Sequence, residues 1–146
     1  MRVQPATGFA NKFKPAALYF AVVLGTGFLL GTIWVPFLVP RLGERYAELL
    51  EMPFMFAAII LAARHVARRY ELPTIAIRLQ VGFMALTMSV LAELLRAAVL
   101  QNQSIGQYIA SRDPVSGTVY LFMLLLFALM PAILAQRQVD PLGSNR

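Results

Sequence analysis

Two opposite charges lie inside one of the apolar stretches of this chain. The segment Ile75–Leu100 is long enough to span a bilayer, and it contains Glu93 and Arg96. In a helix these residues are i, i+3 neighbours, so they share a face and can form an ion pair. Either charge costs about 2.5–3.5 kcal/mol at the centre of a bilayer. The pair is therefore a candidate proton-, ion- or ligand-handling site; its alternative is a structural pair near the helix end, with Arg96 reaching toward headgroups.

Two further acids are expected close to this pair. Glu48 and Glu51 lie just before the preceding apolar run, 53–70. We expect them at a depth in the membrane similar to that of Arg96. Charge-assisted hydrogen bonds among these groups would join two helices in a low dielectric. We therefore predict an intramembrane polar cluster with the following members: Glu93, Arg96, Glu51, Glu48 and Ser89. In this cluster, loss of Arg96 should destabilise the protein more than loss of Arg112 in a connector.

The composition is that of a membrane protein. Of the 146 residues, 59% are hydrophobic and only 14% are charged, which is too apolar for a soluble domain of this size. Cysteine is absent and histidine occurs once, which excludes thiol chemistry, disulfides and multi-histidine metal sites within one chain. We expect no metal and no cofactor. The net charge of +6 is explained by topology and anionic headgroups rather than by nucleic acid.

Four apolar runs predict an all-α, integral membrane four-helix bundle in a single domain, 1–146. A membrane-spanning helix needs about 20 mostly apolar residues. The expected spans are about 16–39, 53–70, 75–100 and 115–136. Proline is favoured at the first position of a helix, and four prolines stand at or next to the starts of these runs: Pro15, Pro53, Pro73 and Pro114. Asp113 is a good N-cap for the last span.

Small residues mark the expected helix-packing faces. Gly27 and Gly31 form a G-x-x-x-G pair, which lets a neighbouring backbone approach closely. Ala58 and Ala62 form a similar face in the second run, and Gly82 lies on the same face of the third run as Ser89 and Glu93. This pattern does not distinguish an internal neighbour from another chain.

His65 is the only histidine, and it lies beside Arg64, Arg68 and Arg69. A lone histidine in this position is best interpreted as a residue at the headgroup boundary. A proton-relay or quinone-contact role is the alternative.

Two connectors have apolar residues at helical spacing, 40–52 and 101–113, and predict short interfacial helices on the outer face. Basic residues set the orientation, because they are enriched on the cytoplasmic side. With the N-terminus inside, the outer connectors hold only Arg41, Arg45 and Arg112. The inner flanks hold the remaining ones: Arg2, Lys12, Lys14, Arg64, Arg68, Arg69, Arg78, Arg137 and Arg146. Both termini are therefore expected in the cytoplasm.

Three stretches, LVPRLGER, EMPFM and ARHVARRY, resemble an uncharacterised family of small four-span bacterial inner-membrane proteins. The resemblance covers about residues 30–100 and implies location and topology, with no activity or site residues. The sequence favours a non-catalytic structural or accessory protein that packs against partner subunits, copies of itself and membrane lipids. The alternatives are a small transporter, channel or lipophilic-ligand binder that uses Glu93 and Arg96, and an enzyme acting on a lipid or quinone.

Overall fold

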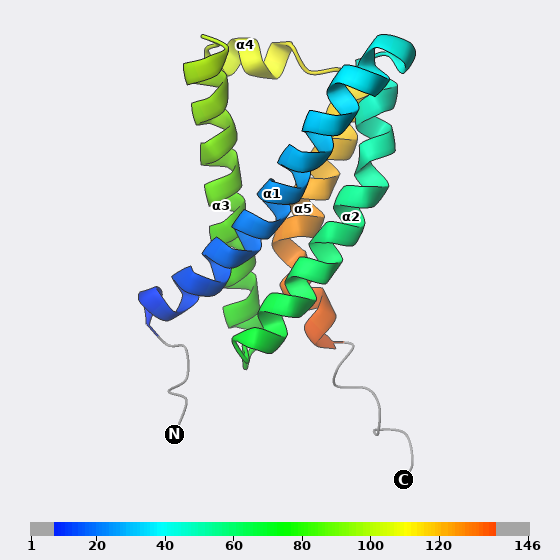
Figure 1. The fold of residues 1–146 in the computed structure, drawn as a ribbon. Helices are drawn as coiled ribbons and strands as arrows, with labels where there is room; N and C mark the ends of the chain where they lie inside the picture. Colours follow the sequence, from blue (N-terminus) through cyan, green and yellow to red (C-terminus); the bar gives the residue numbers. More distant parts are fainter. Residues whose placement is uncertain (1–7, 137–146) are drawn as a thin grey trace.

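The computed structural model describes residues 8–136, and this part of the chain is helical apart from short connectors. Figure 1 shows five helices: α1 (Phe9–Leu42), α2 (Glu44–Arg69), α3 (Ile75–Leu100), α4 (Ile105–Ala110) and α5 (Pro114–Gln136). All except α4 are long and apolar enough to cross a membrane. The predicted all-helical class with four long apolar helices is thus confirmed. Residues 1–7 and 137–146, including most of the expected polar tails, lie outside the described residues.

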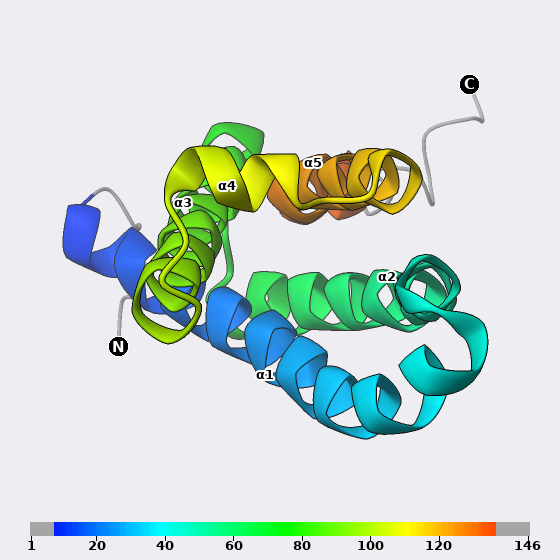
Figure 2. The same cartoon turned by 90° about the horizontal axis from the view of Figure 1, so that it is seen from above.

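The four long helices form a ring in which each packs against two others. Helix α1 lies beside α2 and α3, and α5 lies beside the same two helices from the other side (Figure 2). The short α4 lies across one end of the bundle, between the end of α3 and the start of α5 (Figures 1 and 2). We call this the α4 end, and we call the opposite end, where the described chain begins and finishes, the terminal end.

Two helices begin earlier than their prolines predicted. Helix α1 starts at Phe9, so Pro15 is a buried residue within it, and α2 likewise continues through Pro53. The separate interfacial helix expected over 40–52 was therefore wrong: α1 continues through Pro36 and Pro40, and the chain breaks only at Gly43, whose φ is +81°. Glycine is favoured in this left-handed region because it has no Cβ. The second expected connector helix is present as α4.

The other two helix starts follow the sequence. Pro73 immediately precedes Thr74, whose hydroxyl accepts a hydrogen bond from the backbone N–H of Ile77 at 3.3 Å. Pro114 is the first residue of α5, and the Asp113 carboxylate accepts hydrogen bonds from the N–H groups of Val115 and Ser116, both at 3.0 Å. The Asp113 N-cap is confirmed, and side-chain capping of this kind satisfies donors that a helix start leaves free.

The core lies in the half of the bundle toward the terminal end. Its buried side chains come from all four long helices: Ala16, Tyr19, Val23, Ile59, Ala62, Ala63, Val66, Val81, Ala85, Met123, Phe127 and Met130. Gly82 brings α3 and α5 together, because a Cβ at this position would collide with the carbonyl group of Ala128. The structure thus places Gly82 at a close contact between two helices.

A proline in α5 explains a hydrogen bond between α1 and α5. Pro131 lies inside α5 and has no N–H, so the carbonyl of Phe127 four residues earlier has no helical donor. The buried hydroxyl of Tyr19 donates to this carbonyl at 2.7 Å. The Tyr19 and Phe127 rings also stack, with 4.5 Å between their centroids. Tyr19 thus compensates for Pro131 and joins the two helices, since a buried carbonyl without a partner is costly.

Candidate functional site

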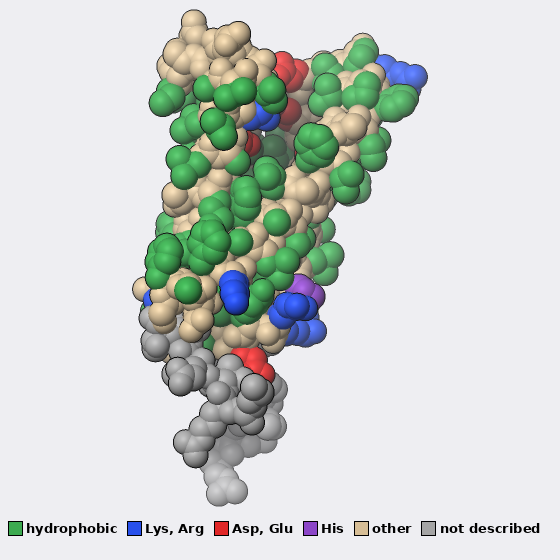
Figure 3. Space-filling view, turned by 60° about the vertical axis from the view of Figure 1, so that its left-hand side comes forward, with side chains coloured by type: hydrophobic (Ala, Val, Ile, Leu, Met, Phe, Trp, Pro, Cys, Tyr) green, Lys and Arg blue, Asp and Glu red, His purple; other side chains and the backbone are tan. Residues whose placement is uncertain are grey.

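The half of the bundle toward the α4 end encloses a cavity of about 950 Å³ instead of a packed core. In Figure 3 the surface is hollowed between the upper parts of α3 and α1, and acidic and basic side chains are visible in the hollow. The floor is the top of the core, formed by Val23, Ile59, Met123 and Phe127. The polar lining comes from α2, α3, α5 and the connector after α4, and it consists of Glu48, Glu51, Ser89, Glu93, Arg96, Arg112 and Tyr120. The cavity is therefore apolar at one end and charged at the other.

Arg112, in the connector between α4 and α5, joins the polar groups. Its guanidinium lies 3.5 Å from a Glu48 carboxylate oxygen and 3.6 Å from one of Glu93. It also donates a hydrogen bond to the Tyr108 hydroxyl at 2.5 Å and lies over the ring of Tyr120, 4.7 Å from the centroid. These contacts reach α2, α3, α4 and α5, so one side chain holds the polar end of the cavity together.

Tyr108 connects α4 to the same group of polar residues. Its hydroxyl donates to the Glu93 carboxylate at 2.6 Å while it accepts from Arg112. Burial raises the pKa of Tyr108, and the hydrogen bond that its hydroxyl gives to Glu93 acts in the same direction. Tyr108 therefore stays a neutral donor. The half-buried Glu93 carboxylate thus has both a neutral hydrogen-bond donor, Tyr108, and a cation, Arg112, beside it.

A second ion pair fixes the connector itself. Arg45, in the first turn of α2, donates to an Asp113 oxygen through two nitrogens, at 2.6 and 2.9 Å. These bonds, followed by the backbone bond from Ser116, lower the pKa of Asp113 to about 2. Since Asp113 also caps α5, this pair joins the starts of α2 and α5 beside Arg112. Arg45 and Arg112, both placed in connectors by the sequence, hold the α4 end of the bundle.

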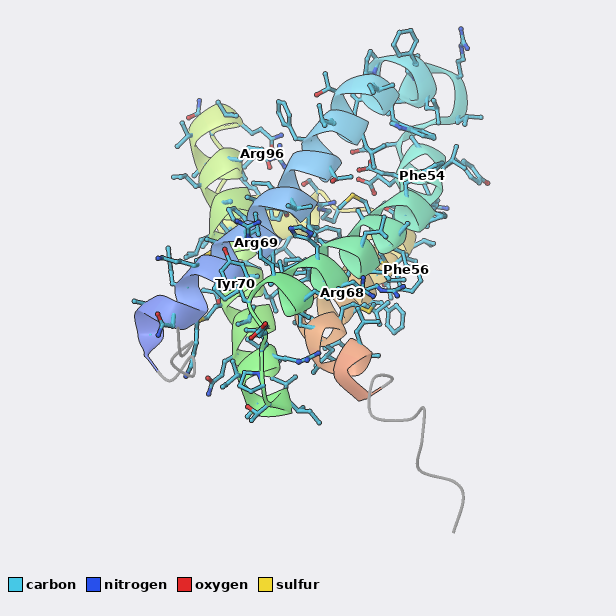
Figure 4. The ribbon with its side chains drawn as sticks, turned by 60° about the horizontal axis from the view of Figure 1, so that its bottom comes forward. Phe54, Phe56, Arg68, Arg69, Tyr70 and Arg96 are labelled. Atoms are coloured by element: carbon cyan, nitrogen blue, oxygen red, sulfur yellow. The ribbon has the colours of Figure 1, made fainter. Side chains whose placement is uncertain are left out.

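The expected pairing of Glu93 with Arg96 was wrong. Both residues belong to the described part of the chain, and the cation within 4 Å of Glu93 is Arg112. Arg96 is exposed to the cavity and makes no ion pair with a described residue; Figure 4 shows it on the side of α3 that faces α1. The physical reason is that the α4 connector returns over α3 and brings Arg112 to Glu93 from outside the helix.

The structure nevertheless gathers the predicted cluster around one space. Glu93, Arg96, Glu51, Glu48 and Ser89 all line the cavity, from α2 and α3. Sequence reasoning missed Arg112, Tyr108 and Tyr120. The available signal was the i, i+4 spacing of Tyr108 and Arg112 across the short helix, which places both on one face.

The predicted packing residues divide into two groups. Ala62 is buried in the core, Ala58 is half-buried and Gly82 contacts α5. Gly27 and Gly31 instead line the cavity, and a Cβ at Gly31 would have no neighbouring atom within 4 Å among the described residues. A Cβ at Gly27 would meet the Met55 side chain of α2 at 3.4 Å, so among the described residues only the Gly31 position of the pair is open to the cavity.

His65 is exposed near the terminal end of α2, far along the helix from the cavity. The single purple side chain in Figure 3 is His65, and basic side chains surround it. In residues 8–136, no three side chains of the types that hold a metal ion lie together. The candidate site is thus the cavity and its charged end.

The chain matches no protein-family model, no curated protein and no solved structure. Its function is therefore inferred from its own residues and their geometry.

Proposed function

We propose that this chain is an integral protein of a bacterial inner membrane, with four spans and both termini in the cytoplasm. Large apolar side chains such as Leu29, Leu91 and Leu121 are exposed along the long helices, as expected of lipid-facing surfaces. The basic residues gathered at the terminal end support the cytoplasmic orientation. Helix α4 has no buried residue and exposes Ile105 and Ile109, which suits a position in the outer headgroup region.

Within that membrane, the proposed function is binding of one amphiphilic, lipid-like molecule in the cavity. The observation that carries this proposal is the cavity of about 950 Å³, which is at the upper end of the range of small-molecule sites, about 300–1,000 Å³. Its apolar floor suits a hydrocarbon tail and its charged end suits a polar head. The hollow between α3 and α1 opens to the side of the bundle, so a lipid can enter from the bilayer (Figure 3).

The unpaired charges indicate the chemistry of the head. Arg112 already contacts Glu48 and Glu93, whereas Arg96 and Glu51 line the cavity without an ion pair to any described residue. Arg96 suits a phosphate, since a guanidinium matches its oxygens in a bidentate fashion. Glu51 suits an ammonium group on the same head. We therefore assign the site to a zwitterionic phospholipid or a molecule with the same head chemistry.

Native mass spectrometry of the full chain from mild detergent tests this function. The wild-type chain should retain one zwitterionic phospholipid, whereas Gly31→Phe should lose it because the new ring occupies open cavity space. Ile33→Phe is the matched control, since Ile33 is exposed and does not line the cavity. Equal retention in all three proteins would contradict a lipid site in the cavity.

The packing of a second chain is the other candidate, and one observation favours it. Gly25 and Gly31 both leave open space on α1, where the helix of a partner subunit or a second copy would fit closely. In the same experiment this function predicts a stable dimer or larger assembly that Gly31→Phe dissociates. A lipid-bound monomer would exclude it.

A further inference from the structure

A second cavity, of about 510 Å³, lies between α2 and α5 toward the terminal end. Three of its lining residues are arginines: Arg64 and Arg68 from α2, and Arg78 from the first turn of α3. The remaining lining residues are apolar, among them Phe56, Leu126 and Ile133. No acidic side chain lines the described walls of this groove, which we call the arginine groove.

The arginine groove has an excess of positive charge without internal compensation. Arg64 and Arg68 are i, i+4 neighbours and so lie on one face of α2. Figure 4 shows Arg68 on the side of α2 that faces α5, whereas Arg69 lies on the other side of the helix. Three guanidinium groups that face one space repel one another unless an anion lies between them.

Arg78 provides an independent observation that points to an anionic ligand in the groove. Its Nε donates to the carbonyl of Leu72 at 2.9 Å, which fixes the side chain. Its Nη1 is buried and donates to no described residue. A buried charged donor without an acceptor is costly, and a phosphate oxygen in the groove would satisfy it.

We propose that the arginine groove binds the headgroup of an anionic phospholipid, with the acyl chains lying over its apolar residues. Basic pockets between membrane helices on the cytoplasmic side are typical sites for such headgroups. The apolar wall favours a lipid over free phosphate, because an inorganic ion has no apolar surface that could pack against Phe56, Leu126 and Ile133. This site is separate from the cavity at the α4 end and needs only the proposed membrane location.

The test measures lipid retention by the full chain in mild detergent, by native mass spectrometry, with phosphatidylglycerol and phosphatidylcholine of identical acyl chains. The Gly31→Phe chain, in which the cavity at the α4 end is blocked, should retain phosphatidylglycerol at least about tenfold better than phosphatidylcholine. Arg64→Gln with Arg68→Gln should abolish the preference. Both arginines are exposed, so the double variant should keep its fold, which thermal denaturation verifies.

Arg69→Gln is the matched control, because it removes a neighbouring positive charge that does not line the groove. Added to Gly31→Phe, it should leave the preference unchanged. Equal retention of the two lipids by the Gly31→Phe chain, or an equal loss of preference when Arg69→Gln is added, would overturn the proposal. Inorganic phosphate that displaces the lipid completely would also overturn it, because the acyl chains would then contribute nothing.

Discussion

Arg112 is the residue on which the polar end of the cavity depends. It carries the contacts that join Glu48, Glu93 and Tyr108 across separate helices. Removal of this half-buried cation leaves the Glu48 and Glu93 carboxylates without a nearby positive charge. An uncompensated half-buried charge costs more than the ion pair itself contributes to stability. Its role at the centre of the site is therefore structural as well as electrostatic.

Arg112→Leu should lower the free energy of unfolding by about 1–3 kcal/mol, because Glu48 and Glu93 lose their shared cation. Arg96→Leu should change it by less than about 0.5 kcal/mol, since Arg96 is exposed to the cavity and unpaired among the described residues. Denaturation of the three proteins in the same detergent measures both values. A larger loss of unfolding free energy for Arg96→Leu than for Arg112→Leu would instead support the pairing of Glu93 with Arg96 that the sequence suggested.

The Arg45–Asp113 pair predicts a dependence of stability on pH. The folded-state pKa of Asp113 is about 2, below the value of about 3.9 expected in the unfolded chain, so folding favours the ionised form. The stabilisation is complete above about pH 4 and is lost as the pH falls toward 2. The wild-type protein should therefore be more stable than Asp113→Asn above pH 4, with the difference vanishing toward pH 2. A difference that stays constant over this range would refute the pair.

At this scale the sequence predicted which groups meet but not how they pair. Helix register places Glu48 with Glu51 on one face of α2 and Ser89 with Glu93 on one face of α3, and their similar depth in the two apolar runs predicts that the two pairs meet. Arg112 reaches Glu93 only because the short α4 turns the chain back over α3. That path depends on long-range packing, which residue spacing does not contain.

At the scale of elements, the helices are held by two close contacts in the core. Tyr19 supplies the donor that Pro131 lacks, and Gly82 lets α3 approach the backbone of α5. The apolar runs predicted the four long helices, but their bounds were less accurate. Pro15 and Pro53 were interpreted as helix starts, yet both lie inside helices. The prediction was wrong because the sequence alone does not distinguish a proline in the first turn of a helix from one that is tolerated in its interior.

A double-mutant cycle tests the Tyr19 contact. Tyr19→Phe should destabilise the protein by about 1–3 kcal/mol, because the buried carbonyl of Phe127 loses its donor. In the Pro131→Ala background, the restored N–H can serve that carbonyl, so the same change should cost clearly less. Thermal or denaturant unfolding in detergent gives the four values. Equal costs in the two backgrounds would show that Tyr19 does not compensate for Pro131.

Gly82→Ala should destabilise the bundle by about 1–3 kcal/mol, because the added Cβ meets the Ala128 carbonyl and pushes α3 from α5. Gly25→Ala is the matched control: its site is open, and alanine is about 0.8–1.0 kcal/mol better than glycine inside a helix. The control should therefore keep or raise the melting temperature. Similar losses for both variants would contradict the close contact at Gly82.

At the scale of the whole molecule, the bundle has a packed core toward the terminal end and a cavity toward the α4 end. This asymmetry was not predictable from the apolar runs, which are of similar character along their length. The glycines of α1 were interpreted as contact residues because small residues usually mark a helix interface. Here Gly31 leaves volume open, and only the arrangement of all four helices distinguishes the two outcomes.

The measurement that tests the account most directly is an experimental structure of the full chain in a lipid bilayer. The proposed function predicts one elongated non-protein density between the upper parts of α1 and α3, with its polar end within hydrogen-bond distance of Arg96 and its tail on Phe127. A cavity closed by the approach of α1 to α3, or filled by side chains of a second copy, would contradict it.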